Sequence, residues 1–169
     1  MDERILQIKH NLSWLPQPNE SRVVLSSHLP PRELIATALV LAFDGDRLLQ
    51  THLVARGWDI VGGHIEPGES PEEAVRREAY EEASARLGDL HLLGYQRLRL
   101  LGPRPDEYRY SYPDSYQAFY WAQIEALDEF TPTEEARERA LFGPDDARML
   151  PFVKMLGELY LVALQAALS

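Results

Sequence analysis

Cysteine is absent from this chain of 169 residues. Without a thiol there is no disulfide framework, no thiolate metal site and no cysteine nucleophile. Long apolar runs are missing as well, because no stretch approaches the ~20 residues of a membrane span. Residues 1–18 are charged from the second position and lack the apolar core of a signal peptide. We therefore expect a cytoplasmic protein without a membrane partner.

Positive charge is also scarce. Lys and Arg number 17 against 27 Asp and Glu, which gives a formal net charge of −10 at pH 7. This balance argues against a protein held to nucleic acid mainly by Lys and Arg, so we expect no nucleic-acid partner. A small nucleotide substrate remains compatible with it, because metal ions bridge an acidic site and a polyphosphate.

The length and the apolar fraction of 45% are those of an ordinary globular protein. A chain of this size holds one full core more readily than two. We expect a single domain over residues 1–169, with residues 1–30 as an N-terminal extension packed on it. The expected C-terminal helix has a broad apolar face, which leaves a homodimer open.

Strand-like and helix-like segments alternate without internal repeats. The segments that favour strands are 23–25, 34–43, 47–54, 58–61, 90–101 and 116–124. The segments that favour helices are 5–15, 70 to about 88, 133–141 and 152–168. Hairpin connections outnumber crossovers, so the expected fold is α/β with a mixed sheet and helices on its faces.

The helix that begins at residue 70 has a readable start. Ser70 is a good N-cap, Pro71 suits the first helical position, and Glu73 completes a capping box. Small and branched residues are expected to form its buried edge, and two further alanines are expected to leave room beside its acidic face. The buried edge is Val75, Ala79 and Ala83, and the two small neighbours are Ala74 and Ala85.

That helix carries Glu78, Glu81 and Glu82 on one face. Like charges at this spacing destabilise a helix by a few tenths of a kcal/mol per pair. A divalent cation such as Mg²⁺ among the carboxylates would remove the repulsion. The alternative is an ordinary solvated acidic face. Arg77 lies four residues from both Glu73 and Glu81 and is expected to orient them by ion pairing.

The spacing of the fixed residues favours the metal site. Gly63 is followed after five residues by Glu69, and after seven more by the run Arg77-Glu78-Ala79-Tyr80-Glu81-Glu82. This resembles the Nudix box, G-x5-E-x7-R-E-U-x-E-E-x-G-U with U an apolar residue. One fixed position departs, because Ser84 replaces the family glycine. That glycine suits a left-handed helix end. We therefore expect the helix to continue for about one turn and end near Gly88.

The resemblance implies a Nudix-type α/β/α sandwich and a hydrolase of nucleoside diphosphates linked to a further group. It also implies Mg²⁺ as cofactor, with Mn²⁺ as a substitute. Glu78 and Glu82 take the place of direct metal ligands, and Glu81 that of a third ligand or of the base that activates water. The remaining family roles fall on Glu69 as a further ligand or support, on the Gly63 carbonyl as a ligand, and on Arg77 as the residue that orients Glu69.

A further acidic residue outside the box often serves as base in this family. The sequence offers several candidates and does not choose among them: Glu107, Asp114, Glu125, Glu134 and Glu135.

Substrate contacts must come from outside the box. Residues 102–116 are rich in Pro and Tyr and predict a long loop between two strands. Tyr108 and Tyr110 are candidates to stack on a base, and Arg104 and Arg109 to hold phosphate. The alternative is a loop packed by its own aromatics, or a dimer contact. Two residues near the box complete the candidates for substrate binding: Arg56 and His64.

The favoured substrate is a free nucleoside di- or triphosphate, because nothing in the sequence marks a bulkier group. ADP-ribose, a nucleotide sugar or a dinucleoside polyphosphate is the alternative within the same chemistry. An isopentenyl-diphosphate isomerase is excluded by the missing cysteine. The alternative of another class is a non-catalytic Nudix-fold regulator that binds nucleotides, although such proteins typically lose box glutamates and this chain has them all.

Overall fold

The computed structural model describes residues 3–169. The strands are β1 (Arg4–His10), β2 (Asn19–Leu25), β3 (Ile35–Asp44), β4 (Arg47–Leu53), β5 (Gly57–Asp59), β6 (Val61–His64), β7 (Ala85–Leu87), β8 (His91–Leu100), β9 (Asp114–Leu127) and β10 (Ala136–Phe142). The helices are α1 (Pro71–Ala83), α2 (Pro144–Ala147), α3 (Pro151–Met155) and α4 (Gly157–Ala167), preceded by a 3-10 turn, η1 (Arg32–Leu34).

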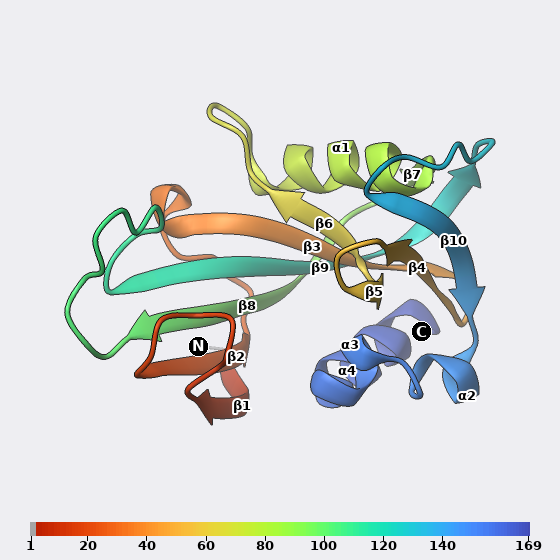
Figure 1. Cartoon of the computed structure of the whole chain (residues 1–169). Helices are drawn as coiled ribbons and strands as arrows, with labels where there is room; N and C mark the ends of the chain where they lie inside the picture. The colour runs from red at the N-terminus through yellow and green to blue at the C-terminus, as the bar shows by residue number, and fades with distance from the viewer. Residues whose placement is uncertain (1–2) are drawn as a thin grey trace.

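One mixed sheet joins these strands in the order β1-β2-β8-β9-β3-β4-β10, and outside this order β5 pairs with β4, β6 with β3 and β7 with β9. The β3–β9 pair is parallel, and the remaining pairs are antiparallel. Helix α1 lies on one face, and α2, α3 and α4 lie near the other (Figure 1). The layers are those of an α/β/α sandwich, as the sequence predicts.

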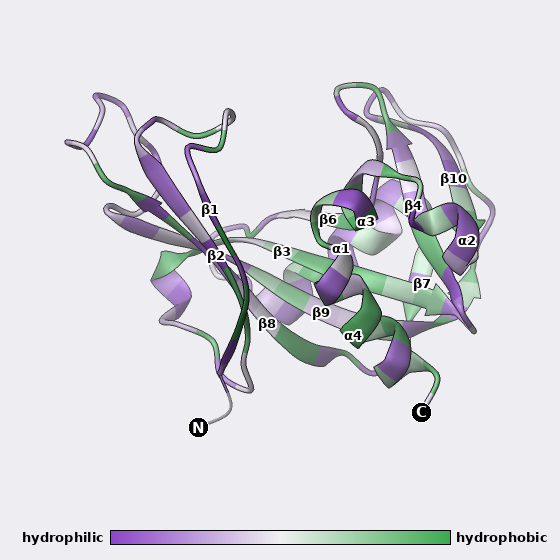
Figure 2. Ribbon diagram, turned by 90° about the horizontal axis from the view of Figure 1, so that it is seen from below, coloured by the Kyte–Doolittle hydropathy of each residue, from purple (hydrophilic) through white to green (hydrophobic). Residues whose placement is uncertain are grey.

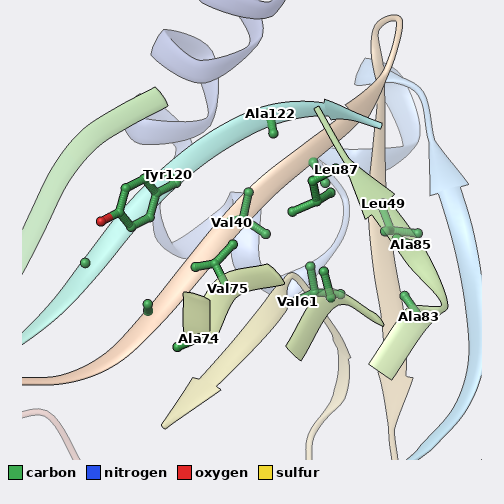
Figure 3. Close-up of a cluster of buried hydrophobic side chains, with 14 of the residues drawn as sticks. Val40, Leu49, Val61, Ala74, Val75, Ala83, Ala85, Leu87, Tyr120 and Ala122 are labelled. Carbon is green, nitrogen blue, oxygen red and sulfur yellow. The ribbon is translucent and has the colours of Figure 1, made fainter. Parts of the chain in front are cut away.

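The core beneath α1 is built from small and branched side chains. Val75, Ala79 and Ala83 are fully buried on the inner edge of the helix, as expected. They pack with Val40 of β3 and Val61 of β6 in one cluster (Figure 3). Small residues on α1 bring its axis close to the sheet, which places the helix beside β6 and the turn that follows it.

A second cluster fills the space between the sheet and the C-terminal helices. Phe43 and Phe119 of the sheet pack there against Leu159 and Tyr160 of α4. In the view from below, α4 crosses the sheet (Figure 2). Helix α3 contacts the β1–β2 end of the sheet, because the Gln7 side chain donates a hydrogen bond of 2.9 Å to the Met155 carbonyl and Val23 belongs to the same cluster. Among the helices of residues 3–169, none has both the length and the apolar character that crossing a bilayer requires.

Two predicted helices are wrong. Residues 5–15 begin with strand β1, whose Ile5 and Ile8 are about half exposed, and residues 133–141 lie largely in β10. Both are edge strands of the sheet, paired to β2 and to β4. The local sequence carries helix-like spacing in both segments, but pairing with a partner strand elsewhere in the chain overrides weak local propensity.

The ends of two other helices also differ from expectation. The C-terminal helix is interrupted at Leu156, whose φ of −126° and ψ of 46° separate α3 from α4. Helix α1 ends at Ala83 and does not reach Gly88. Ser84 itself adopts the left-handed conformation, with a φ of 52°, and strand β7 follows at once. A non-glycine residue in this conformation costs about 1 kcal/mol, and pairing of β7 with β9 offsets it.

Candidate active site

The turn between β6 and α1 depends on two glycines because the backbone runs against its neighbours. A Cβ on Gly62 would lie 2.5 Å from the Ala38 carbonyl oxygen of β3. A Cβ on Gly63 would lie 2.7 Å from Cδ of Glu78. The Glu78 carboxylate therefore occupies the space that any other side chain at position 63 would need.

Helix α1 begins as the sequence predicts and fixes the direction of its glutamates. The Ser70 hydroxyl accepts a hydrogen bond from the Glu73 amide, and the Glu73 carboxylate accepts one from the Ser70 amide. Glu73 is thereby committed to the capping box, so the predicted Arg77–Glu73 ion pair is wrong. Ala74 and Ala85 are buried in the core rather than lining an open acidic face, so the room predicted beside them does not exist.

Arg77 is the centre of the polar network. Its guanidinium donates two hydrogen bonds to Glu69, at 2.6 and 3.0 Å. It donates further bonds to Glu78 at 2.9 Å, to Glu81 at 3.1 Å and to the His64 carbonyl at 3.1 Å. One rigid, planar cation thus ties both ends of the box together, a task that suits the forked geometry of arginine.

A second arginine, outside the box, holds the loop that carries Glu69. Arg32 of η1 donates hydrogen bonds to the carbonyl oxygens of Glu69 at 2.9 Å and of Ile35 at 3.2 Å. It also reaches the Glu66 carbonyl at 3.4 Å. The turn between β6 and α1 is therefore fixed from both sides, by Arg77 through side chains and by Arg32 through the backbone.

The three box glutamates differ in environment. Glu82 is buried, and its carboxylate accepts a hydrogen bond of 3.0 Å from the Gly62 amide. The Glu78 side chain is 18% exposed and the Glu81 side chain 58% exposed. They do not form the single tight cluster that the helical wheel predicts, because Glu82 points toward the sheet while Glu81 points toward solvent.

Burial shapes the acidity of these groups. Desolvation raises the pKa of Glu82 to about 7, with the neighbouring Glu78 charge adding to the rise. Desolvation also raises the pKa of Glu78, although Arg77 opposes the shift. Hydrogen bonds from Arg77 lower the pKa of Glu69 to about 2. Glu69 is therefore fully ionised, whereas the partly buried Glu78 and the buried Glu82 lack enough compensating positive charge.

A divalent metal ion fits this donor set. Within residues 3–169, no three His, Asp or Glu side chains converge at metal-ligand spacing. Mg²⁺, however, takes only one or two protein carboxylates and completes its shell with substrate phosphates. The Glu78 carboxylate sits against the Gly63 backbone, and Glu82 lies behind it on Gly62. A cation there would supply the positive charge that these two desolvated carboxylates lack.

A cleft of about 600 Å³ begins at this turn and runs along the sheet. At the box end it is lined by Gly62, Gly63, His64, Arg56 and Asp59. Its floor is made by side chains of β3, β8 and β9, and its far wall by the connection between β1 and β2. This volume is in the range that accommodates a ligand of nucleotide size.

The sequence model of a known family matches most of the chain. The sequence model of the NUDIX domain matches residues 32–160. The chain belongs to the Nudix family. That assignment confirms the resemblance carried by the box.

Curated relatives match parts of this Nudix chain. The NAD-capped RNA hydrolase NudC of Pseudomonas syringae pv. syringae is 28% identical over 116 residues, covering 67% of this chain and 37% of its own. YtkD of Bacillus subtilis, provisionally named an 8-oxo-dGTP diphosphatase, is 33% identical over 104 residues, covering 62% of this chain and 59% of its own. Across the curated relatives the matched share of their own length runs from 15% to 59%.

Solved structures confirm the Nudix fold. The crystal structure of the Bacillus subtilis pyrophosphohydrolase BsRppH, in a mutant form, aligns with a TM-score of 0.67 at 25% identity. The alignment covers 89% of this chain and 92% of that one. The mixed sheet with helices on both faces is therefore the Nudix arrangement over nearly the whole chain.

The Nudix box ends differently from the prediction but keeps its glutamates in place. Ser84 takes the left-handed conformation that the family glycine would adopt, and its amide still bonds to the Tyr80 carbonyl at 2.9 Å. Glu82 stays against the Gly62 amide, one residue before the helix ends at Ala83. The strained residue at position 84 therefore lies just beyond the end of α1, and Glu78, Glu81 and Glu82 lie within the helix before it.

The predicted substrate residues fall into two groups. Arg56, His64 and Tyr110 line the cleft, and the His64 ring stacks on Tyr110 with centroids 6.0 Å apart. The other three belong to the loop before β9 and lie away from the cleft lining: Arg104, Tyr108 and Arg109. Tyr108 is buried there beside Leu98, while Arg104 donates to the Tyr108 carbonyl and Arg109 to the Tyr110 hydroxyl.

One of the five candidate bases stands near the box. The charge of Glu135 contributes to raising the pKa of Glu78, after the larger influences of desolvation, Arg77 and Glu81. Asp114 is committed elsewhere, because Arg99 donates two hydrogen bonds to it at 2.7 and 2.8 Å. Glu107, Glu125 and Glu134 have no hydrogen bond to any box residue among residues 3–169.

Several residues of this Nudix cleft escape sequence reasoning. They come from β1, its following loop and the sheet floor: Lys9, Leu12, Trp14, Gln96, Gln117 and Phe119. None of these six residues belongs to a motif that the sequence reveals. Arg32 escapes sequence reasoning too, since its role lies in backbone contacts that no motif records.

Proposed function

We propose that this chain is a metal-dependent hydrolase that cleaves a phosphoanhydride bond in nucleoside di- or triphosphates. The observation that carries the proposal is that Glu78 and Glu82 lie against Gly63 and Gly62, the two glycines that line one end of the cleft. A polyphosphate lying in the cleft would meet these two glutamates and the box turn together.

Glu78, Glu82 and the Gly63 carbonyl would hold Mg²⁺ or Mn²⁺. A divalent ion bound there supplies the Lewis-acid charge that activates water and neutralises phosphoryl oxygens. Arg77 orients Glu69, Glu78 and Glu81 through its hydrogen bonds to their carboxylates. Supporting contacts of this kind commonly affect metal affinity or activity by about 10- to 100-fold.

The proton of the attacking water needs an acceptor. Glu81 is exposed beside the turn and held by Arg77 at 3.1 Å, so it can take a proton from water above the carboxylates. Glu135 is the second choice, because its charge acts on Glu78 from the loop before β10. Mutation distinguishes Glu81 from Glu135, because only substitution of the true base should abolish the acidic limb of the pH–rate profile.

The comparisons support a pyrophosphohydrolase. BsRppH, the structural relative, bears that activity in its description, and YtkD is provisionally named for a nucleoside triphosphate. A second candidate substrate is an NAD-capped RNA end, favoured by the NudC match, which covers 67% of this chain. ADP-ribose, nucleotide sugars and dinucleoside polyphosphates remain alternatives within the same chemistry.

The organisation of the protein is part of the proposal. We take residues 1–169 as one Nudix domain on which residues 1–30 pack through β1 and β2. A cytoplasmic location, a homodimer and the absence of nucleic acid as a partner stay predictions from the sequence.

A substrate panel tests the function. Purified protein is incubated with nucleoside di- and triphosphates, 8-oxo-dGTP, ADP-ribose, nucleotide sugars, dinucleoside polyphosphates and NAD-capped RNA, each with Mg²⁺ or Mn²⁺. Release of phosphate or pyrophosphate from a nucleoside di- or triphosphate, stopped by EDTA, is the expected result. Preferred turnover of NAD-capped RNA would select the second candidate. No turnover of any compound with either metal would favour the non-catalytic regulator.

A further inference from the structure

The loop between β1 and β2 is held in a defined shape by one buried side chain. Asn19 is fully buried. Its amide group donates hydrogen bonds to the carbonyl oxygens of Leu12, Leu15 and Pro16, at 3.1 to 3.2 Å, and accepts one from the Leu12 amide at 2.9 Å. The backbone of residues 12–16 is therefore held by Asn19 without any ligand, and such preorganisation favours binding.

This loop displays a tryptophan at the cleft. Leu15 is buried against Leu98 and Leu100 of β8, which anchors the loop on the sheet. Trp14 beside it is 56% exposed and lines the cleft. An exposed indole on a rigid loop has a large apolar face without a partner, whereas tryptophan normally buries most of its surface.

The floor of the cleft carries polar side chains in a row. Thr37 of β3, Gln117 of β9 and Gln96 of β8 are aligned across the three strands. Gln96 donates to the Ser21 hydroxyl at 2.7 Å. The Gln117 amide has no hydrogen bond to any residue in 3–169. An amide offers both donors and an acceptor, the combination that pairs with the edge of a nucleobase.

The alternative is that these residues only complete the fold. Trp14 would then be one exposed aromatic among several, and Gln117 would be satisfied by water. The position of the row argues against this, because the same cleft begins at Gly62 and Gly63 beside the proposed metal ligands. The apolar Phe119 follows Gln117 on the same face of β9 and extends the floor of the cleft. A flat ring with a polar edge matches that floor.

We propose that the end of the cleft formed by Trp14, Gln96 and Gln117 binds the base of the nucleotide substrate. Trp14 supplies the stacking face, and the two glutamine amides contact the base edge. The phosphates then extend toward Gly63. This inference rests on the proposed function for the identity of the ligand as a nucleotide, but it concerns binding rather than hydrolysis.

Equilibrium binding of products tests the base site without turnover. AMP, GMP, CMP, UMP and ribose 5-phosphate are titrated by calorimetry into the full-length protein in the presence of Mg²⁺. None has a phosphoanhydride bond to cleave. Because base–aromatic stacking contributes about 1–3 kcal/mol, at least one monophosphate should bind about tenfold or more tightly than ribose 5-phosphate. Equal binding of all five, or no binding, would overturn the proposal.

Variants locate the contact. Trp14→Ala should remove most of the difference in affinity between the preferred nucleoside monophosphate and ribose 5-phosphate. Trp14→Phe should retain much of that difference. Gln117→Leu should reduce the differences among the four bases while leaving stacking. Leu161→Ala is the matched control, since Leu161 is 55% exposed on α4 and does not line the cleft. If Trp14→Ala unfolds thermally like the wild type and still binds the monophosphate more tightly than ribose 5-phosphate by the wild-type factor, Trp14 is not the stacking residue.

The same titration separates this inference from the proposed function. Glu78→Gln should lose hydrolysis yet keep the preference for a nucleoside monophosphate over ribose 5-phosphate. If the wild type hydrolyses nothing but still binds through Trp14, the base site stands and the catalytic proposal fails. If it hydrolyses nucleotides while Trp14→Ala binds like wild type, the catalytic proposal stands and the base site fails.

Discussion

The two ends of the cleft are built in opposite ways. At the box end the acidic residues lie within one turn and one helix, from Gly63 to Glu82, and Arg77 binds three of them. At the far end the lining comes from a loop near the N-terminus and from strands β8 and β9. The first is compact in sequence, whereas the second exists only once the sheet has formed.

The difference separates chemistry from selectivity. A motif on one helix places carboxylates by helical geometry alone, so its spacing is readable in the sequence. Base recognition here needs Trp14, Gln96 and Gln117 to meet, which requires the pairing of β2 with β8 and of β8 with β9. Mutations at the box end should therefore change turnover, and mutations at the far end should change affinity.

The largest expected effect is at the box end. Glu78→Gln and Glu82→Gln should each lower kcat by about a thousandfold or more, because a catalytic metal ion contributes several kcal/mol. Steady-state release of phosphate or pyrophosphate measures it. Glu72→Gln, exposed in the first turn of the same helix, is the matched control. Metal-dependent turnover near the wild-type rate in either variant would break the distinction between the two ends.

Arg77→Lys should have the next largest effect. Lysine keeps the charge but cannot donate at once to Glu69, Glu78 and Glu81, so activity should fall by about 10- to 100-fold. Arg148→Lys, in an exposed pair with Asp145, is the control. Activity within about twofold of wild type would show that the network around Arg77 is not needed to position the glutamates.

The pH dependence of stability tests the burial of Glu82. Its pKa is about 7 in the folded protein against an ordinary value of 4.5. Between these values the unfolded chain loses its proton first, so without metal the wild type loses stability as pH rises from 4.5 to about 7. Glu82→Gln should be more stable above this window, by roughly 3 kcal/mol at most.

Urea unfolding in EDTA at several pH values measures the effect. The two proteins should converge toward pH 4.5, the ordinary pKa of the glutamate, as the Glu82 side chain becomes neutral. Added Mg²⁺ should stabilise the wild type and narrow the difference at neutral pH. A constant difference across the whole range would mean that Glu82 is not a buried acid.

At the far end, Asn19→Ala should lower the free energy of unfolding by about 2 kcal/mol, because buried carbonyl groups of residues 12–16 lose their donor. Affinity for the preferred monophosphate should fall as well, since Trp14 would no longer be held. Denaturant unfolding and calorimetry measure the two effects. Gln165→Ala, exposed on α4, is the control. If Asn19→Ala is destabilised but binds the nucleotide with unchanged affinity, the loop between β1 and β2 does not contribute to nucleotide recognition.

The smallest effect is expected at the end of α1. Ser84→Gly should raise the free energy of unfolding by about 1 kcal/mol, because glycine adopts a φ of 52° without strain. Activity should stay at the wild-type level, since the carboxylates lie within the helix. Thermal unfolding measures the gain. A loss of stability would show that the Ser84 side chain has a role beyond ending the helix.

Local chemistry is readable in the sequence, and long-range pairing is not. Ser70, Pro71 and Glu73 predict the start of α1 because the capping box lies within four consecutive residues. Residues 5–15 and 133–141 favour helices in the sequence alone, because their strands form only against partners elsewhere in the chain. The helix end is equally hidden, because the strand after Ser84 imposes its strained conformation.

The far end of the cleft is the part that the sequence reveals least. Trp14 and Gln117 carry no motif, so only the folded sheet places them in one cleft. The box, by contrast, holds its glutamates, its arginine and its glycine turn within a single continuous segment.

Steady-state kinetics of Glu78→Gln and Trp14→Ala on the best substrate tests the division between the two ends most directly. We expect Glu78→Gln to lose kcat with KM little changed, and Trp14→Ala to raise KM with kcat little changed, as for the loss of uniform binding. A change in the same kinetic parameter, kcat or KM, in both variants would contradict this division. Metal-dependent turnover in Glu78→Gln at the wild-type rate would contradict it as well.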